Sequence, residues 1–172
     1  MSAAALVALL ADPARTVDDW DGVIAAARAE QLIGSLAFRL TGVALPPAVA
    51  AVMADARTAA AEQRRSALWE AEMARRALAP LGAPVVLLKG TAFAAAGLAA
   101  GQGRSIGDLD ILVPHDALDA VEAALLTAGW TWAKDDPYDA AYYRRWMHEL
   151  PPLVHAERDR MIDVHHTILP PT

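Results

Sequence analysis

The stretch Val85–Val113, VVLLKGTAFAAAGLAAGQGRSIGDLDILV, decides the fold that the sequence predicts. Val85–Leu88 is an apolar run of strand length, and Lys89–Thr91 then turn the chain into a short alanine-rich helical segment. A glycine-rich loop, Gly101–Arg104, leads to a second apolar run of strand length, Leu109–Val113. The pattern therefore predicts a strand, a helix and a second strand in succession.

Two aspartates stand at the head of the second strand. Asp108 and Asp110 are two positions apart, so we expect their side chains on the same face, with Cα atoms roughly 6.6 Å apart. One hard divalent cation can bridge two carboxylates at that spacing. Gly90 and Thr91 stand where a strand gives way to a helix, and free backbone N–H groups there can face an anion. An acid pair beside such an anion cradle is typical of metal-dependent phosphoryl or nucleotidyl transfer.

These motifs, taken in order, resemble a known superfamily. Lys89–Thr91, a helix, Arg104 and then Gly107–Val113 (GDLDILV) are similar to the core of the polymerase-beta-type nucleotidyltransferases. The chain most resembles a bacterial family of uncharacterised nucleotidyltransferases, which shares the Leu-Lys-Gly start and a Gly-Asp-hydrophobic-Asp strand. A second block of that family is similar to His148–His155 followed by Ile162–His166.

The resemblance implies an α+β fold with a nucleotidyltransferase-like small mixed β-sheet, flanking helices and an N-terminal helical region. It implies that Asp108, Asp110 and Asp163 hold two Mg²⁺ ions. The implied reaction moves an NMP from an NTP to a hydroxyl-type acceptor on a small molecule or a protein and releases pyrophosphate; ATP is the most frequent donor in the superfamily. Family members usually continue with further helices, so the resemblance also implies a core that is truncated or a short variant.

The resemblance also assigns residues to the triphosphate. Lys89, Gly90 and Thr91 match the turn that binds the β- and γ-phosphates, although this chain has Thr where Ser is usual and Lys before the Gly. A threonine hydroxyl can make the same hydrogen bond, and the lysine adds a cation directed at phosphate. Arg104 is a candidate for contacting phosphate or for orienting an aspartate. The alternatives are that Lys89 only ends a buried strand and that Arg104 is only an exposed residue of a surface loop.

The histidines are harder to assign from the sequence. Alternation along a strand puts His165 on the face of Asp163, where it could orient that carboxylate, touch substrate or act as a base. His155 is expected across a hairpin from it. His148, His155 and His166 are weaker candidates, because polar strand histidines are often hydrogen-bonded structural groups.

Composition narrows the class of protein. The chain has 172 residues, 55% hydrophobic and 21% charged, which is typical of a globular fold. It has no cysteine, so disulfides and zinc–thiolate sites are excluded. The N-terminus lacks a basic segment and its apolar run is too short to span a bilayer, so we expect a cytoplasmic protein without a membrane partner.

Charge bears on the partners. The net charge is −6, and residues 83–172 hold 7 basic and 12 acidic side chains, against 8 and 9 in residues 1–82. Binding to a long nucleic acid depends on neutralising phosphates with Lys and Arg, and the acidic half has no basic stripe. An NTP with Mg²⁺ is the expected partner, and a long nucleic acid is not.

Residues 1–82 are predicted to be an N-terminal helical region, and residues 83–172 the nucleotidyltransferase core. Residues 3–11 form a short helix candidate, and a helical face then runs from the caps Asp18 and Asp19 to Thr41-Gly42. One helix of about thirty residues is expected from Pro46-Pro47 to Ala79, since no Gly or Pro interrupts it. Core positions are predicted for Trp20, Trp69 and Met73, and a solvated face with ion pairs for Arg64, Arg65, Arg75 and Arg76 among Glu62, Glu70 and Glu72.

After Pro114, Asp116 is a candidate cap for a helix over Ala117–Ala128, and Trp130–Ala133 is a candidate strand. Residues 134–137 are expected to turn, and Tyr138–Met147 to be helical or irregular. Residues 153–156 and 161–168 are predicted to form a β-hairpin with a polar loop.

Two other classes of function stay open at this point. One is a catalytically inactive regulator that binds NTP without turnover. The other is a helical interaction module in which residues 1–80 are the functional part, for example as an oligomerisation surface. Mg²⁺-dependent nucleotide binding and pyrophosphate release separate the three classes.

Overall fold

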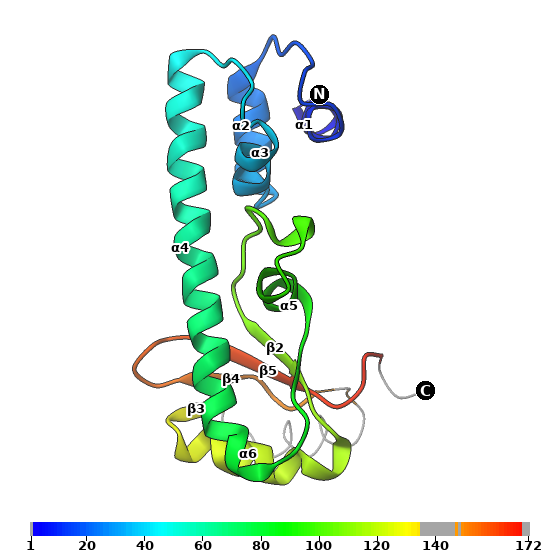
Figure 1. Cartoon of the computed structure of the whole chain (residues 1–172), viewed down its shortest axis with the longest axis vertical. Coiled ribbons are helices and arrows are strands. Elements are labelled where there is room, and N and C mark those ends of the chain that lie inside the picture. The colour runs from blue at the N-terminus through cyan, green and yellow to red at the C-terminus, as the bar shows by residue number, and fades with distance from the viewer. Residues whose placement is uncertain (1, 135–146, 148, 170–172) are drawn as a thin grey trace. The chain divides into compact units, whose positions relative to one another are not determined.

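The structure is a computed structural model that describes residues 2–134, 147 and 149–169 (Figure 1). Helices dominate the first part of the chain, and the strands follow residue 85. The α-helices are α1 (Ser2–Ala11), α2 (Trp20–Ala29), α3 (Ile33–Arg39), α4 (Pro47–Leu78), α5 (Lys89–Ala95) and α6 (Leu118–Thr127). The strands are β1 (Val86–Leu87), β2 (Leu109–Leu112), β3 (Trp130–Trp132), β4 (Leu153–His155) and β5 (Met161–His165). Short 3-10 helices are η1 (Ala79–Leu81), η2 (Ala99–Gly101) and η3 (His115–Ala117).

The chain divides into two compact units. Residues 1–65 with 97–105 form one, which we call the helical unit, and residues 66–96 with 106–172 form the other, the sheet unit. The boundary falls inside α4, between Arg65 and Ser66. The sequence-based division after residue 82 stays a prediction about folding domains.

In the helical unit, α1, α2, α3 and the first part of α4 pack around an apolar core that includes Leu6, Leu36 and Met53. Asp19 caps α2 as predicted, because its carboxylate accepts a hydrogen bond from the N–H of Gly22 at 2.8 Å. The long helix predicted after the proline pair is confirmed as α4, which has 32 residues.

The single helix predicted before Thr41 is wrong, since α2 and α3 are separate. Gln31 lies between them with φ 57°, in the left-handed region. The N–H of Leu32 donates to the carbonyl of Ala27 at 2.7 Å, and the N–H of Gln31 donates to the carbonyl of Arg28 at 3.1 Å. This pair of bonds is a helix C-cap that usually has Gly or Asn at the left-handed position, so a glutamine there gave no signal in the sequence.

Within the helical unit, Gly34 and Gly103 allow α3 and the loop around residue 103 to pack closely, backbone against backbone. A Cβ atom on Gly34 would lie 2.3 Å from the carbonyl oxygen of Gly103, and a Cβ atom on Gly103 would lie 2.3 Å from the carbonyl oxygen of Gly34. Gly103 also has φ 67°. Backbone meets backbone here without room for a side chain, so the glycines of this loop have a packing role.

The sheet unit holds one five-stranded sheet in the order β1-β2-β5-β4-β3. β2 and β5 are parallel, and the other neighbouring strands are antiparallel. The predicted α+β class, mixed sheet and N-terminal helical region are therefore confirmed, as is the hairpin made by β4 and β5. The parallel register sets Asp110 beside Asp163 and Leu112 beside His165.

Alternation along β2 and β5 separates an apolar face from a polar one. The polar face carries Asp110, Asp163 and His165, and the last two share a face as the sequence predicted. The apolar face packs against α4 and α6 and includes Leu109, Ile111, Ile162 and Val164, each at most 3% exposed.

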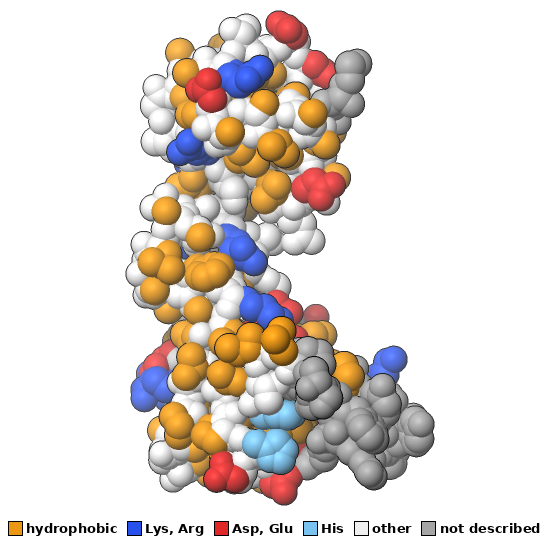
Figure 2. Space-filling model, turned by 90° about the vertical axis from the view of Figure 1, so that its right-hand side faces the viewer, with side chains coloured by type: hydrophobic (Ala, Val, Ile, Leu, Met, Phe, Trp, Pro, Cys, Tyr) orange, Lys and Arg blue, Asp and Glu red, His pale blue; other side chains and the backbone are white. Residues whose placement is uncertain are grey.

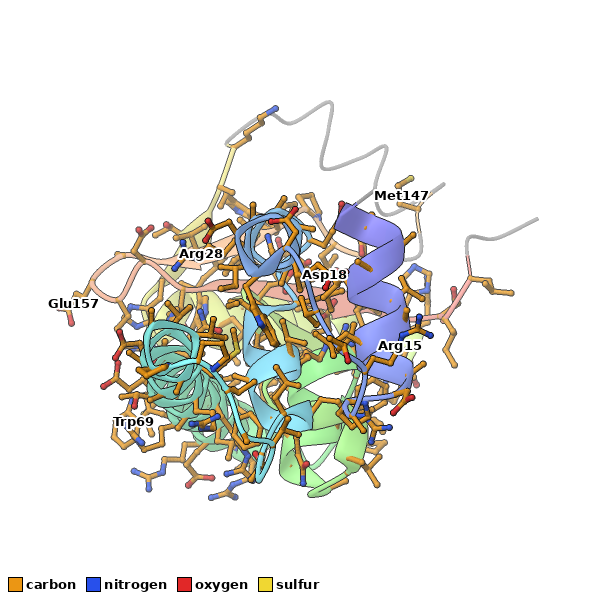
Figure 3. The ribbon with its side chains drawn as sticks, turned by 90° about the horizontal axis from the view of Figure 1, so that it is seen from above. Arg15, Asp18, Arg28, Trp69, Met147 and Glu157 are labelled. Atoms are coloured by element: carbon orange, nitrogen blue, oxygen red, sulfur yellow. The ribbon has the colours of Figure 1, made fainter. Side chains whose placement is uncertain are left out.

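The core predictions for three large side chains have mixed outcomes. Trp20 and Met73 are partly buried and pack against the two apolar cores, as predicted. Trp69 is 56% exposed and points outward from α4 (Figure 3), so the prediction for it is wrong. The buried stripe of this part of α4 runs through Ala67 and Ala74, one heptad apart, and Trp69 falls outside it.

The prediction of a solvated charged face on α4 is right for Glu62 and Glu72 and wrong for Glu70. Glu62 pairs with Arg65 at 3.9 Å, and both side chains are exposed. Arg75 and Arg76 both pair with Glu72, at 2.7 and 2.8 Å. Glu70 is instead 6% exposed and pairs with Arg158 of the β4–β5 loop. A partner 88 positions away along the chain cannot be found from helical spacing.

The helix predicted after Pro114 begins at Leu118, after the short turn η3. Asp116 lies inside η3, and Ala117 occupies the N-cap position without a side-chain cap hydrogen bond, so the predicted cap is wrong. The strand predicted at Trp130 is confirmed as β3.

Two predictions from the sequence fall outside the described residues. This applies to His148 and to the segment Tyr138–Met147, apart from Met147 itself. The predicted turn at residues 134–137 is described only at Lys134.

Candidate active site

Three carboxylates from two neighbouring strands meet on the polar face of the sheet. Asp108 lies just before β2, Asp110 lies on β2 and Asp163 lies on β5, and one oxygen of each is within 4.8 Å of the others. The register explains this, because Asp110 stands directly beside Asp163 and Asp108 is the preceding same-face position. Asp110 is buried, Asp163 half-buried and Asp108 exposed, so the cluster is reachable from the Asp108 side.

The cluster has a surplus of negative charge. Burial first, and then repulsion from Asp108, Asp110 and Glu149, raises the pKa of Asp163 from 3.8 to about 6. A divalent cation would cancel this repulsion, and carboxylate oxygens are the ligands that Mg²⁺ prefers. The three acids that the sequence predicted as metal ligands therefore suit a hard cation in both chemistry and spacing.

Lys89 is held on this cluster. Its Nζ lies 2.5 Å from Oδ1 of Asp110, and this hydrogen bond is the main reason that the pKa of Lys89 is raised. The Lys89 backbone has φ 46°, a left-handed conformation that costs a non-glycine residue about 1–3 kcal/mol and is typical of functional sites. In this arrangement the lysine meets a carboxylate, and its predicted contact with phosphate stays a prediction.

The other predicted phosphate ligands are less accessible or lie elsewhere in the chain. Gly90 and Thr91 lie in the first turn of α5, and both are buried. Thr91 is 1% exposed, and its hydroxyl has no hydrogen-bond partner among the residues that the structure describes. Arg104 is exposed and belongs to the helical unit. Phosphate binding by these three residues stays a prediction.

His165 contacts a different aspartate from the one expected. Its Nε2 lies 3.0 Å from Oδ1 of Asp110, and its Nδ1 lies 3.2 Å from Oε2 of Glu149. The sequence pointed to Asp163 because the two share a strand face, whereas the parallel pairing with β2 brings the ring to Asp110. Glu149 was missed as a site residue. The sequence did contain a signal for Glu149, because this residue lies in the block His148–His155 that is similar to the family.

His155 is not across the hairpin from His165, and that prediction is wrong. The residue bridged to His165 is Glu149. His155 lies at the loop end of the hairpin, where its ring meets Trp130 edge to face with centroids 4.9 Å apart, and its Nε2 is 2.5 Å from Nη1 of Arg158. This buried position is structural in character.

The remaining described histidines, His115 and His166, contact each other, and His115 is exposed whereas His166 is half-buried. His115 and His166 meet edge to face with ring centroids 4.8 Å apart. Nε2 of His166 lies 3.1 Å from the carbonyl oxygen of Met147. Neither ring belongs to the acidic cluster.

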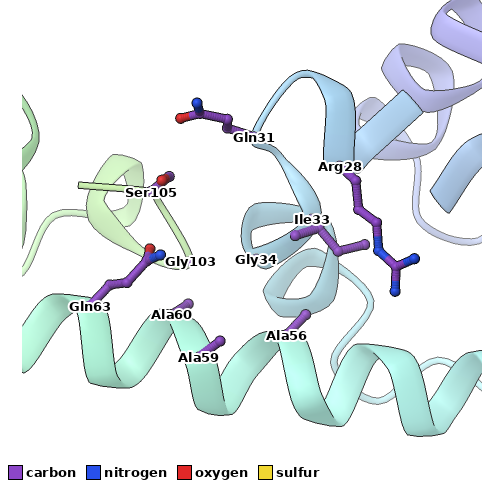
Figure 4. Close-up of a pocket in the computed structure, with 10 residues that line it drawn as sticks. All are labelled: Arg28, Gln31, Ile33, Gly34, Ala56, Ala59, Ala60, Gln63, Gly103 and Ser105. Carbon is purple, nitrogen blue, oxygen red and sulfur yellow. The ribbon is translucent and has the colours of Figure 1, made fainter. Parts of the chain in front are cut away.

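The helical unit has a pocket of its own, of about 220 Å³ (Figure 4). Alanines of α4 form much of its wall, and none of its lining residues is acidic, so it lacks the ligands for a divalent cation. The lining residues are Arg28, Gln31, Ile33, Gly34, Ala56, Ala59, Ala60, Gln63, Gly103 and Ser105.

Basic side chains are scattered over one face of the molecule. On the face shown in Figure 2, Lys and Arg side chains occur singly or in small groups and form no continuous stripe. No helix within the described parts of the chain is long and apolar enough to cross a membrane.

Comparison with known proteins identifies the family. No curated protein and no solved structure matches the chain. A family described as an uncharacterised nucleotidyltransferase matches residues 16–172, which include all three clustered aspartates. The resemblance inferred from the sequence is confirmed by this match, and the chain belongs to that nucleotidyltransferase family.

Proposed function

We propose that this protein is a Mg²⁺-dependent nucleotidyltransferase that moves an NMP from an NTP to a hydroxyl-type acceptor and releases pyrophosphate. The observation that carries the proposal is the convergence of Asp108, Asp110 and Asp163 within 4.8 Å in a member of a nucleotidyltransferase family. An acidic cluster with a raised pKa is expensive for a fold to keep, and binding a cation explains why it is kept.

The three aspartates would hold two Mg²⁺ ions. When bound, such ions supply charge neutralisation for the triphosphate and lower the pKa of an attacking hydroxyl. Asp110 and Asp163 come from adjoining strands with a fixed register, so their separation is set by the sheet. Asp108 is the exposed member, so a nucleotide from solvent would approach the cluster from its side.

Lys89 is the group of this chain best suited to the triphosphate. Its side chain is 56% exposed although its Nζ contacts Asp110. The Lys89 ammonium can therefore also face a phosphate bound at the cluster. We assign to it the phosphate contact implied by the Lys-Gly-Thr turn. Gly90, Thr91 and Arg104 are secondary candidates for the same contact.

The donor and the acceptor are proposed in broader terms. ATP is the proposed donor because it is the most frequent one in the superfamily. A small molecule or a protein side chain is proposed as the acceptor, since a net charge of −6 disfavours a polynucleotide.

The test uses nucleotides labelled at the α-phosphate, with Mg²⁺ and a cell extract as the source of acceptors. The wild-type protein should release pyrophosphate and transfer label to a small molecule or a protein, and EDTA or Asp110→Asn should abolish both. Glu157→Gln, a change at the tip of the hairpin loop (Figure 3), is the control and should behave as wild type. Binding of Mg²⁺ and NTP without pyrophosphate release would identify an inactive regulator, and no metal-dependent binding would favour a helical interaction module.

A further inference from the structure

His165 stands between two carboxylates from different segments. It is 3% exposed. One ring nitrogen lies 3.0 Å from Asp110, and the other lies 3.2 Å from Glu149. The three side chains therefore form a continuous chain of contacts, Glu149 to His165 to Asp110, that ends on the most buried acid of the cluster.

The backbone fixes both ends of this chain. β5 pairs with β2 so that His165 stands beside Leu112, and the carbonyl of His165 accepts a hydrogen bond from the N–H of Val113 at 2.9 Å. On its other side, an antiparallel bridge joins His165 to Glu149, and the N–H of Leu150 donates to Val164 at 2.8 Å. The backbone of His165 is thus flanked by a paired segment on each side, one near Asp110 and the other carrying Glu149.

The contacts on Asp110 leave part of it available to a cation. Lys89 and His165 both meet Oδ1 of Asp110. Oδ2 takes part in neither contact. Two partners on Oδ1 restrict the rotation of the carboxylate, so Oδ2 keeps one orientation in which it can bind a metal ion. Carboxylate ligands of metals are commonly oriented in this way by hydrogen bonds from residues that do not touch the metal.

We infer that Glu149 and His165 are positioning residues that hold Asp110 in the orientation needed to bind a divalent cation. The inference rests on the proposed function, because it requires Asp110 to be a metal ligand. Glu149 orients the ring through Nδ1, and the ring orients Asp110 through Nε2. Neither residue needs to touch the metal or the nucleotide.

The experiment measures Mn²⁺ binding to the metal-free protein by calorimetry, since Mn²⁺ also prefers carboxylate ligands and the readout does not depend on activity. Glu149→Ala should weaken Mn²⁺ binding about 10- to 100-fold, as the loss of an orienting partner does elsewhere. Glu149→Gln should bind within a few-fold of wild type, because the side-chain amide can still form a hydrogen bond with the ring. Glu157→Ala removes the same charge at an exposed position and should bind as wild type.

A second variant guards against misfolding. Glu149→Asp keeps the charge but shortens the side chain, and it should weaken Mn²⁺ binding while the unfolding midpoint stays near that of wild type. Wild-type affinity in Glu149→Ala or in Glu149→Asp would overturn the positioning role. Loss of binding in Asp110→Asn together with full binding in Glu149→Ala would leave the proposed function intact and remove only this inference. A wild-type protein that binds no Mn²⁺ would remove the metal site and the positioning role with it.

Discussion

Two buried carboxylates of the sheet unit, Glu70 and Asp110, are treated in opposite ways by their surroundings. They are 6% and 3% exposed. Both oxygens of Glu70 accept hydrogen bonds from Arg158, at 2.8 and 3.0 Å. The guanidinium therefore compensates the negative charge of Glu70. At Asp110 the two partners, the Lys89 ammonium and the His165 ring, both contact the same oxygen, Oδ1.

The neighbours of the two acids differ as well. Arg158, the partner of Glu70, also lies over the ring of Trp130, 5.0 Å from the ring centre, and beside His155. Asp110 lies in a cluster with Asp108 and Asp163. A carboxylate whose two oxygens are both paired joins segments of the fold, whereas a carboxylate left among other acids is suited to bind a cation.

The largest effect is expected from Asp110→Asn. The substitution keeps the shape of the side chain and removes one proposed metal ligand, so nucleotidyl transfer should fall by more than the roughly 10- to 100-fold typical of residues outside the metal's immediate shell. Initial rates of pyrophosphate release at saturating Mg²⁺ and ATP measure it. Activity within a few-fold of wild type would mean that Asp110 is not a metal ligand.

Glu70→Ala should chiefly cost stability. Removing Glu70 leaves Arg158, whose side chain is 28% exposed, without its carboxylate partner, and the expected loss is about 1–3 kcal/mol of unfolding free energy, measured by urea titration. Mn²⁺ affinity should be unchanged where the protein is still folded. Glu72→Ala breaks the exposed pairs with Arg75 and Arg76 and is the matched control on the same helix, with little change in the urea midpoint expected. Equal costs for the two variants would contradict the structural role of Glu70.

Mg²⁺ should stabilise the folded protein in proportion to its occupancy. At a concentration one hundred times the Kd, a ligand that binds only the native state adds about 2.7 kcal/mol to the unfolding free energy. Thermal denaturation with and without Mg²⁺ measures this shift. Asp163→Asn should lose the shift and Glu157→Gln should keep it. A shift of equal size in Asp163→Asn would place the bound metal elsewhere.

The pH dependence of stability isolates Asp163. Its folded pKa of about 6 lies above the unfolded value of 3.8, so the native state holds more protons between those values, and its contribution to unfolding free energy falls as pH rises through that window. Without metal, Asp163→Asn should therefore gain stability relative to wild type as pH rises from about 4 to 6, and the gain should level off above 6. Denaturant titrations at several pH values measure the difference. A constant difference across this range would contradict the raised pKa.

The sequence was informative where the signal is local. Spacing and turn residues predicted the Asp-x-Asp strand and the hairpin with its polar loop. They also predicted the long helix that follows Pro46-Pro47. Asp163 entered the proposed ligand set only through resemblance to the family. The physical cause of its proximity, the parallel pairing of β2 with β5, joins segments about fifty residues apart and leaves no local trace.

Other features depended on such long-range pairing and were therefore missed. The burial of Glu70 requires Arg158, and the contact of His165 with Asp110 requires the β2–β5 register. The break between α2 and α3 at Gln31 was missed for a different reason, because the fold imposes a left-handed residue where the sequence offers no glycine.

The most direct test of the metal site is a calorimetric titration of Mg²⁺ with ATP into wild type and Asp108→Asn. Asp108 is the exposed member of the cluster, so the substitution leaves the apolar core of the sheet unit untouched. Wild type should bind Mg²⁺-ATP with a measurable heat, and Asp108→Asn should bind it far more weakly while unfolding at the same urea concentration. Equal affinity in the two proteins would contradict the proposal that these three aspartates hold the metal.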